Sequence, residues 1–445
     1  MSRTGLVTPR YTEDFVCIGS ACEDNCCGSW GVPITRSAYE KYQTLPEGPL
    51  RKLIDASILL APKGAVASDG FGPEAFAKIR MNESNACPMK SADGLCQIHS
   101  QVGPSFLSSI CATYPRVLRS VRGAEQNALA LSCPEAARIV LLNPLTWKQV
   151  EPPTPTSGET HSEDLPDSSV LWAIRSVVLN IVSNRAYPLW QRLLHLGVLC
   201  RQLDALTPDW PKDEVSKCLD DFDQTVADGT LRLDMESLSV DPSAQLDAVL
   251  RLAGLMGKKS IITPRFVECI NAFKMGIGYG PTATTLEALT AGYKTAHDRF
   301  FAPFFNRHPH ILENYLINTI LRCRFPFGPD ESNRDAAHSA TREFTTLIAQ
   351  FSVIRGLLVG VAGAHRGSFS TEHVVQTVQS ASKCFDHHPE FPKLAHDLLV
   401  KLGLDQLNGA ALLIRNQKSG NRALGKRRIS NVCPIPEMRL SAEHA

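Results

Sequence analysis

The stretch Phe344-Thr-Thr-Leu-Ile-Ala-Gln-Phe-Ser-Val-Ile-Arg-Gly-Leu-Leu-Val-Gly-Val361 sets the fold class of this chain. Its apolar residues recur every three or four positions, which places them on one face of an α-helix. An earlier stripe with the same spacing contains Val170, Leu171, Ile174, Val177, Val178, Ile181 and Val182. Further stretches with helical spacing are 188–206, 213–227, 244–256, 264–275, 284–301 and 309–323. Because alternating strand patterns are scarce, we predict a mainly α fold with a helical array over 169–410.

The composition around this array is that of an ordinary globular protein. The chain has 445 residues, 43% of them hydrophobic and 20% charged, which suffices for two or three domains. Its 46 basic and 45 acidic residues leave a net charge of +1, so no global field attracts nucleic acid or an anionic membrane. No stretch approaches the roughly 18–20 uninterrupted apolar residues of a membrane-spanning helix, and the first residues lack a secretory apolar core. We therefore expect a cytoplasmic protein with no membrane or nucleic-acid partner.

The first third of the chain differs from the rest in its cysteine content. Eight of the fourteen cysteines precede residue 134, at Cys17, Cys22, Cys26, Cys27, Cys87, Cys96, Cys111 and Cys133. In a reducing compartment, such a density is more typical of metal ligation than of disulfides. The segment also carries only short periodic runs, so a bound metal would supply much of its folding energy. We predict an irregular, cysteine-rich metal-binding domain over 1–150.

Two further segments have the composition of a linker and of a flexible chain terminus. Residues 151–168, EPPTPTSGETHSEDLPDS, contain four prolines and almost no large apolar residue, which is typical of a linker or a long surface loop. The segment Arg415–Arg428 contains six basic residues and no acid. We predict a basic, flexible tail over 411–445.

The adjacent pair Cys26-Cys27, inside Cys22-x3-Cys26-Cys27, bears on the kind of metal. Zinc ligand pairs are commonly two to four residues apart, whereas adjacent thiolates can reach different irons of one cluster. The spacing favours an iron–sulfur site, and a zinc-only site is the alternative. The Cys-x3-Cys-x2-Cys motif typical of radical S-adenosylmethionine enzymes is absent here.

Several segments taken together resemble the flagellin lysine-N-methylase family. They are Phe15-Val-Cys-Ile-Gly-Ser-Ala-Cys-Glu-Asp-Asn-Cys-Cys-Gly-Ser-Trp30, Asp93-Gly-Leu-Cys96, Cys111-Ala-Thr-Tyr-Pro-Arg116, Ser132-Cys-Pro-Glu-Ala-Ala-Arg138, Leu312-Glu-Asn-Tyr-Leu-Ile-Asn318 and Phe325-Pro-Phe-Gly328. The cysteine spacing is also similar to that of the CxxxCC group of zinc- or iron-chelating proteins. The resemblance extends from about residue 11 to about residue 360, and so covers both parts of the chain.

The resemblance implies a protein that transfers methyl groups from S-adenosylmethionine to lysine side chains of flagellin and carries an iron–sulfur cluster, with a 4Fe-4S cluster favoured. Its metal ligands would come from Cys22, Cys26, Cys27, Cys87, Cys96, Cys111 and Cys133. Because a four-iron cluster needs only four thiolates, the ligand set stays open. We rank Cys22, Cys26, Cys27, Cys96 and Cys111 first.

Lysine methylation also needs side chains that steer a neutral amine toward the methyl group. The candidates are Tyr114, Arg116, Glu313, Asn314, Tyr315 and Asn318. Asn314 and Asn318 are four residues apart and share one helix face, which suggests a cleft. Tyr315 fits a core position equally well, and the alternative role of Arg116 is to balance the charge of a cluster.

The sequence contains no recognisable loop for a methyl donor. The glycine-rich segment Gly276-Ile-Gly-Tyr-Gly280 does not follow a hydrophobic strand and lacks the G-x-G-x-x-G spacing. The alternative function is therefore a non-enzymatic module that binds a protein partner and whose metal cluster is structural or senses redox state.

Overall fold

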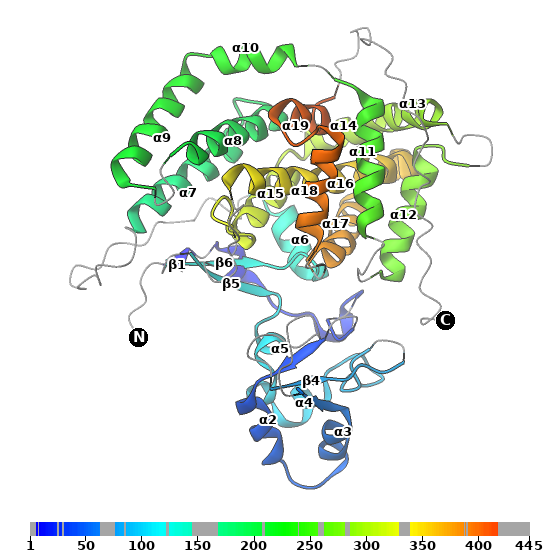
Figure 1. Cartoon of the computed structure of the whole chain (residues 1–445). Helices are drawn as coiled ribbons and strands as arrows, with labels where there is room; N and C mark the ends of the chain where they lie inside the picture. The colour runs from blue at the N-terminus through cyan, green and yellow to red at the C-terminus, as the bar shows by residue number, and fades with distance from the viewer. Residues whose placement is uncertain are drawn as a thin grey trace.

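The computed structural model describes residues 6–7, 9–24, 26–28, 31–62, 76–83, 86–121, 124–144, 168–206, 210–238, 240–256, 262–280, 285–328, 339–386, 388 and 390–416. In Figure 1, a large helical body lies above a small lobe; Cys87 belongs to the core of this lobe, and Cys27 and Cys96 pack against that core. All but the last residue of the predicted linker, and the tail after Asn416, lie outside the described residues.

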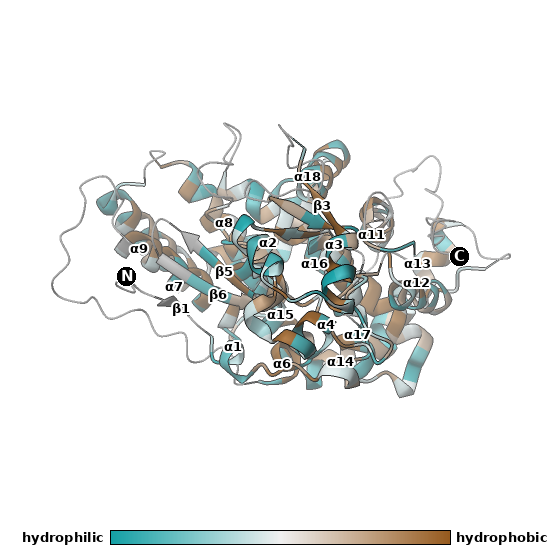
Figure 2. Cartoon of the chain, turned by 90° about the horizontal axis from the view of Figure 1, so that it is seen from below, coloured by the Kyte–Doolittle hydropathy of each residue, from teal (hydrophilic) through white to brown (hydrophobic). Residues whose placement is uncertain are grey.

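Helices make up the body. They are α7 (Ser168–Ser183), α8 (Leu189–Asp204), α9 (Lys212–Ala227), α10 (Thr230–Ser237), α11 (Pro242–Met256), α12 (Pro264–Gly276), α13 (Leu286–Ala296), α14 (Ala302–Arg307), α15 (His310–Arg322), α16 (Ala340–His365), α17 (Thr371–Asp386), α18 (Phe391–Leu402) and α19 (Leu407–Ile414). A π-helix, His297–Phe301, joins α13 to α14. Hydrophilic and hydrophobic residues alternate around surface helices such as α9 (Figure 2), as amphipathic helices require. The predicted mainly α fold is confirmed.

The stripe Phe344–Val361 forms the middle of α16, the central helix of the body. Ser339 caps its first turn by accepting a hydrogen bond from the Arg342 backbone N–H at 3.1 Å. The segment Ala340–Ser368 is long and apolar enough to cross a membrane, but 94% of its most apolar window is buried inside the protein. Among the described residues it is the one helix that meets this criterion, and its burial is that of a core helix in a soluble protein.

Helix α12 packs against α16 at very short range. A Cβ added to Gly276 would lie 1.7 Å from the carbonyl oxygen of Gly360, so neither backbone could keep its place with a larger residue at 276. The following Gly278 has φ +79°, and it turns the chain away from the end of α12. This glycine-rich segment is thus a helix end and a turn, and its conformation serves packing.

The small lobe has its own fold and its own core. Its helices are α2 (Arg36–Gln43), α3 (Pro49–Ser57), α4 (Gln97–Val102) and α5 (Ser109–Thr113). Its antiparallel sheet has the order β2 (Val32–Ile34), β4 (Ala77–Ile79), β3 (Ile58–Leu60), and Ile79 pairs with both Val32 and Ile58. The buried residues of this core are Val32, Ile34, Ala38, Tyr42, Leu50, Ile54, Ala77, Ile79, Cys87, Met89 and Ile98.

Both ends of the predicted 1–150 domain pack on the helical body. Strands β1 (Leu6–Val7), β6 (Ala124–Leu129) and β5 (Arg116–Val121) form a second sheet, with β1 parallel to β6. Helices α1 (Tyr11–Asp14) and α6 (Pro134–Leu142) accompany this sheet, and Tyr11, Leu129 and Val140 belong to the core of the body. The division at residue 150 therefore differs from the packing, because the apolar face of α6 is buried against the helices.

The predicted tail also begins later than expected. Helix α19 extends to Ile414, and Ala411, Leu413 and Ile414 are buried in the body. The guanidinium of Arg415 then donates to the carbonyl oxygens of Met235 at 3.1 Å and Leu238 at 2.7 Å. Residues 411–415 are thus part of the helical body, since apolar burial and these hydrogen bonds hold them.

Candidate functional site

The cysteines of the small lobe lie on short loops that backbone hydrogen bonds bring together. The N–H of Cys87 donates to the carbonyl oxygen of Cys27 at 2.7 Å, next to an antiparallel bridge between Gly28 and Ala86. A second bridge pairs Lys90 with Cys96, which is the residue before α4. Three cysteines far apart in the sequence are thereby fixed in one network.

The thiols are close enough to perturb one another. Although Cys111 is exposed at the surface, the protein around its thiol removes part of its hydration, and this effect together with the neighbouring Cys87, Cys96 and Cys26 raises its pKa to about 11. Burial also raises the pKa of Cys87, with additions from Cys96 and Cys26. A hydrogen bond between Cys26 and Cys27 raises the pKa of Cys27 and lowers that of Cys26 to about 7. We call Cys26, Cys27, Cys87, Cys96 and Cys111 the thiol group.

Cys22 and Cys133 adjoin the thiol group. Burial raises the pKa of Cys133 to about 12, and Cys22 and Cys26 contribute to the shift. Burial likewise raises the pKa of Cys22, to which Cys17 adds. Cys133 is also the residue that precedes α6, where the positive end of the helix dipole favours a thiolate. All seven predicted ligands therefore lie in one region of the structure. Cys26 acts both on Cys111 of the thiol group and on Cys133.

The spacing of these side chains bears on the kind of metal. Among the described residues, no three His, Cys, Asp or Glu side chains lie close enough to hold a single ion. Thiolates around one zinc would have Zn–S distances of about 2.3 Å and sulfurs ~3.8 Å apart. A multi-iron cluster keeps its thiolate ligands farther apart because a larger inorganic body lies between them. A donor set of thiols alone, on several loops, has the chemistry that an iron–sulfur cluster needs, and the kind of metal stays a prediction.

A buried ion pair joins the cysteine loop to the helical body. The ammonium of Lys383 on α17 lies 3.1 and 3.0 Å from the two carboxylate oxygens of Asp24. The side-chain amide of Gln379 donates to Asp24 at 2.7 Å and to the carbonyl oxygen of Ser132 at 2.9 Å. We call Asp24, Gln379 and Lys383 the interlobe clamp. The signal available in the sequence was an acid inside Cys22-x3-Cys26, and sequence reasoning missed its partners on α17.

Tyr114 is the predicted catalytic residue that lies beside the thiols. Its hydroxyl is 3.2 Å from the Ser132 hydroxyl. Burial raises the pKa of Tyr114, and the nearby Cys133 adds to the shift, so the phenol stays protonated near neutral pH. The buried Asp386, 3.0 Å from the guanidinium of Arg322, also acts on it. Tyr114 therefore stands between the cysteines and a buried ion pair of the body.

Arg116 has a different environment. Its guanidinium donates to the carbonyl oxygens of Phe15 at 3.0 Å and Thr12 at 3.3 Å, and it lies 5.2 Å from the centre of the Phe15 ring. These contacts tie the start of β5 to the end of α1. Arg116 therefore helps to hold the N-terminal segment on the helical body.

The two asparagines of α15 do share a face, but that face is filled. The Asn318 amide donates to the carbonyl oxygen of Leu129 at 2.8 Å, while its oxygen accepts from the Leu129 N–H and from the Tyr11 hydroxyl. The Asn314 amide donates to the carbonyl oxygens of Val140 and Asn143, both at 2.9 Å. The expected cleft is therefore absent along this face, because β6 and α6 cover it.

Their neighbours on α15 are buried as well. Tyr315 is 2% exposed and its ring lies 6.4 Å from that of Phe351, which is a core environment. The carboxylate of Glu313 is held by Arg185 at 2.9 Å and Arg192 at 2.8 Å. All four side chains serve the packing of α15, and their catalytic roles stay predictions.

A family of known proteins matches the helical body. The model of the FliB lysine N-methylase C-terminal domain matches residues 175–413, which is more than half of the chain. The chain belongs to this lysine N-methylase family. The matched segment begins inside α7 and ends inside α19, so it covers nearly the whole helical body.

Curated relatives extend the likeness to the small lobe. The lysine-N-methylase of Salmonella typhimurium is 20% identical over 411 residues, covering 89% of this chain and 95% of the relative. That of Salmonella choleraesuis is 20% identical over 408 residues with the same coverage. The flagellar biosynthetic protein FliU of Salmonella muenchen is 27% identical over 144 residues, which cover 32% of this chain and 81% of FliU. No solved structure matches the chain at a comparable level of significance.

Proposed function

We propose that this family member is an S-adenosylmethionine-dependent protein lysine N-methyltransferase that acts on flagellin in the cytoplasm. Membership of the lysine N-methylase family is the observation that carries the proposal, because the match covers the helical body. The names of the relatives favour lysine methylation, and one relative is named as flagellar. The coverage of 95% of the lysine-N-methylases means that no large part of them is missing here.

We further propose that the thiol group and its neighbours hold a four-iron cluster. The group supplies five thiols, and Cys22 and Cys133 adjoin it, so four ligands can be drawn from the set. The small lobe supports the assignment, because its core of eleven buried residues, as far as the structure describes them, is small for independent stability. A cluster bound there would supply covalent cross-links between the loops and a redox-active centre.

Methyl transfer to lysine requires residues that orient the substrate amine. The amine nitrogen of the substrate lysine must lose its proton and attack the methyl carbon, while the carbon–sulfur bond breaks and its electron pair stays on sulfur. Tyr114 suits the task of orienting the nitrogen, because its hydroxyl is protonated and lies beside the thiols. The interlobe clamp would keep Tyr114 and Cys133 in register, since Gln379 holds the backbone at Ser132.

Labelled methyl transfer tests the proposal. The purified protein, reconstituted anaerobically with iron and sulfide, is incubated with flagellin and methyl-labelled S-adenosylmethionine. We expect label on lysine, and no label on a matched flagellin whose lysines have been chemically acetylated beforehand. Absence of label across several flagellins would refute the methyltransferase.

Donor binding separates the enzyme from a non-enzymatic module. Titration calorimetry with S-adenosylmethionine should show saturable binding if the protein is the enzyme. If the donor gives no heat and no thermal shift while flagellin still binds, the alternative holds, in which the cluster supports a structural or redox-sensing module.

A further inference from the structure

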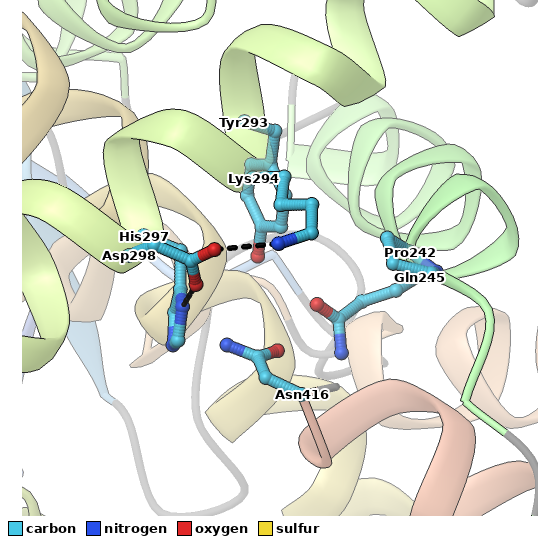
Figure 3. A pocket seen from close by; sticks show the side chains of 7 residues that line it. All are labelled: Pro242, Gln245, Tyr293, Lys294, His297, Asp298 and Asn416. Atoms are coloured by element: carbon cyan, nitrogen blue, oxygen red, sulfur yellow. Dashed lines mark hydrogen bonds and ion pairs between the residues drawn. The ribbon is translucent and has the colours of Figure 1, made fainter. Parts of the chain in front are cut away.

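A small cavity lies in the helical body between α11 and the junction of α13 with the π-helix (Figure 3). Its lining residues are Pro242, Gln245, Tyr293, Lys294, His297, Asp298 and Asn416. Its enclosed volume of about 10 Å³ holds one small group of atoms, and the cavity is open to solvent on one side. π-Helical turns inside longer helices occur frequently at functional sites.

The acid in this cavity is already satisfied. One oxygen of Asp298 lies 2.6 Å from the Lys294 ammonium, and the other lies 2.8 Å from Nδ1 of His297. Because a carboxylate only accepts, Nδ1 carries the proton in this contact. Lys294 and Asp298 therefore balance each other in charge.

A second cation lies behind the cavity. Arg355 on α16 is 7% exposed and makes no ion pair with any acid of the described chain. Its guanidinium lies 3.5 Å from the Gln245 side-chain oxygen and 5.5 Å from the centre of the Phe301 ring, and it also interacts with the Tyr293 hydroxyl. Burying a guanidinium without an anion is costly, so its charge leaves the region positive.

Burial and the charge of Arg355 set the protonation states of His297 and Tyr293. Burial and the positive charge of Arg355 together lower the pKa of His297 to about 4, so the imidazole is neutral near pH 7. Burial raises the pKa of Tyr293, which keeps its hydroxyl protonated. A cation entering the cavity would meet the repulsion of Arg355 in addition to the cost of burial.

Two hydrogen-bond donors are available in the cavity. Tyr293 is 2% exposed, and its hydroxyl makes no hydrogen bond of good geometry with the described residues. The side-chain amide of Asn416 points toward the same space in Figure 3. The Gln245 amide is not available, because it donates to the carbonyl oxygens of Leu412, Leu413 and Arg415. These bonds fix the backbone that presents Asn416.

We propose that this cavity binds one small monovalent anion, either a halide ion or a single carboxylate group, between the Tyr293 hydroxyl and the Asn416 amide and in the field of Arg355. The anion would satisfy the buried hydroxyl and neutralise the buried guanidinium. The site is independent of the proposed methyl transfer, since it lies in the helical body and shares no residue with the thiol group.

Thermal unfolding of the full chain at constant ionic strength tests the proposal. Sodium bromide or sodium formate replaces sodium gluconate, whose anion is too large for the cavity. We expect saturable stabilisation by the small anions, as mass action requires for a ligand of the native state. Tyr293→Phe should weaken the apparent affinity about five- to tenfold, the effect of losing one hydrogen bond. Tyr279→Phe, a half-exposed tyrosine outside the cavity, should change nothing.

A second variant guards against an effect of Tyr293→Phe on folding. Asn416→Asp keeps the size of the side chain but adds a negative charge, and it should abolish the response to anions. A response to formate alone would assign the site to a carboxylate group, and a response to both anions to the shared charge. The proposal would be overturned if the small anions gave no stabilisation over gluconate, or if Tyr293→Phe and Asn416→Asp both responded to anions as the wild type does. Stabilisation by methylammonium gluconate would also overturn it, because it would mean that the cavity binds a cation.

Discussion

The helical body and the small lobe are stabilised in different ways. One continuous apolar core joins segments of the body from Tyr11 to Ile414, whereas the described core of the lobe contains eleven buried residues. Burial of apolar surface suffices for the first, and a small domain of the second kind usually needs disulfides or a metal. We therefore expect the helical body to be stable by itself and the stability of the lobe to depend on its cysteines.

The largest expected effect follows from removing the adjacent cysteines. Cys26→Ser combined with Cys27→Ser should strip iron from the protein and unfold the lobe, because thiolate ligation is coupled to folding. Iron content and limited proteolysis measure this, and cleavage should fall within residues 31–107 while the body survives.

The control variants alter cysteines buried in the body. Cys269→Ser and Cys384→Ser should leave the iron content unchanged, since both side chains are buried in the helical body, in α12 and α17. Unchanged iron in the Cys26/Cys27 double variant would contradict the assignment of the thiol group.

The second expected effect concerns the body alone. Leu316 on α15 is completely buried, so Leu316→Ala should lower the free energy of unfolding by about 2–5 kcal/mol. Denaturant unfolding followed by circular dichroism measures this, since helices dominate the signal. Iron content should not change, and a coupled loss of iron would mean that the two halves are not energetically distinct.

Asn318→Ala distinguishes scaffold from catalysis. The Leu129 backbone and the Tyr11 hydroxyl would lose their buried partner, at a cost of about 3 kcal/mol. Methyl transfer per folded molecule should stay near the wild-type value. A stable variant with lost turnover would instead assign Asn318 to catalysis, as the sequence first suggested.

The smallest of these effects belongs to the clamp between the two halves. Lys383→Met should lower the stability of the lobe by about 2 kcal/mol, less than a fully buried pair would lose, because Asp24 keeps its bond to Gln379. Hydrogen exchange of the lobe amides measures the change, and Lys383→Arg should recover part of it. Equal exchange rates in Lys383→Met and the wild type would contradict the claim that the interlobe clamp stabilises the lobe.

The helical body could largely be predicted from the sequence because its elements are amphipathic. The stripe from Val170 to Val182 lies within α7, and the stretch 309–323 corresponds to α15 at His310–Arg322. Helix α6 has Pro134 in its first turn, a position that proline favours. Local periodicity carries such information without reference to distant residues.

Contacts between distant segments could not be predicted in this way. Tyr11 bonds to Asn318 across 307 positions, and Asp24 pairs with Lys383 across 359. Nothing in either local pattern indicates its partner, so the sheet beneath α15 and the interlobe clamp were missed. The amide pair Asn314 and Asn318 suggested a cleft for the same reason, because the strand and helix that cover it are distant in sequence.

The most direct test of the central claim is peptide-mapping mass spectrometry of flagellin. Flagellin is produced with and without this protein in a bacterial host that has no lysine methylase of its own. We predict methylated lysines only when this protein is present, and their loss in the Cys26→Ser, Cys27→Ser double variant. Unmodified lysines in both samples, with the protein soluble and iron-loaded, would contradict the account.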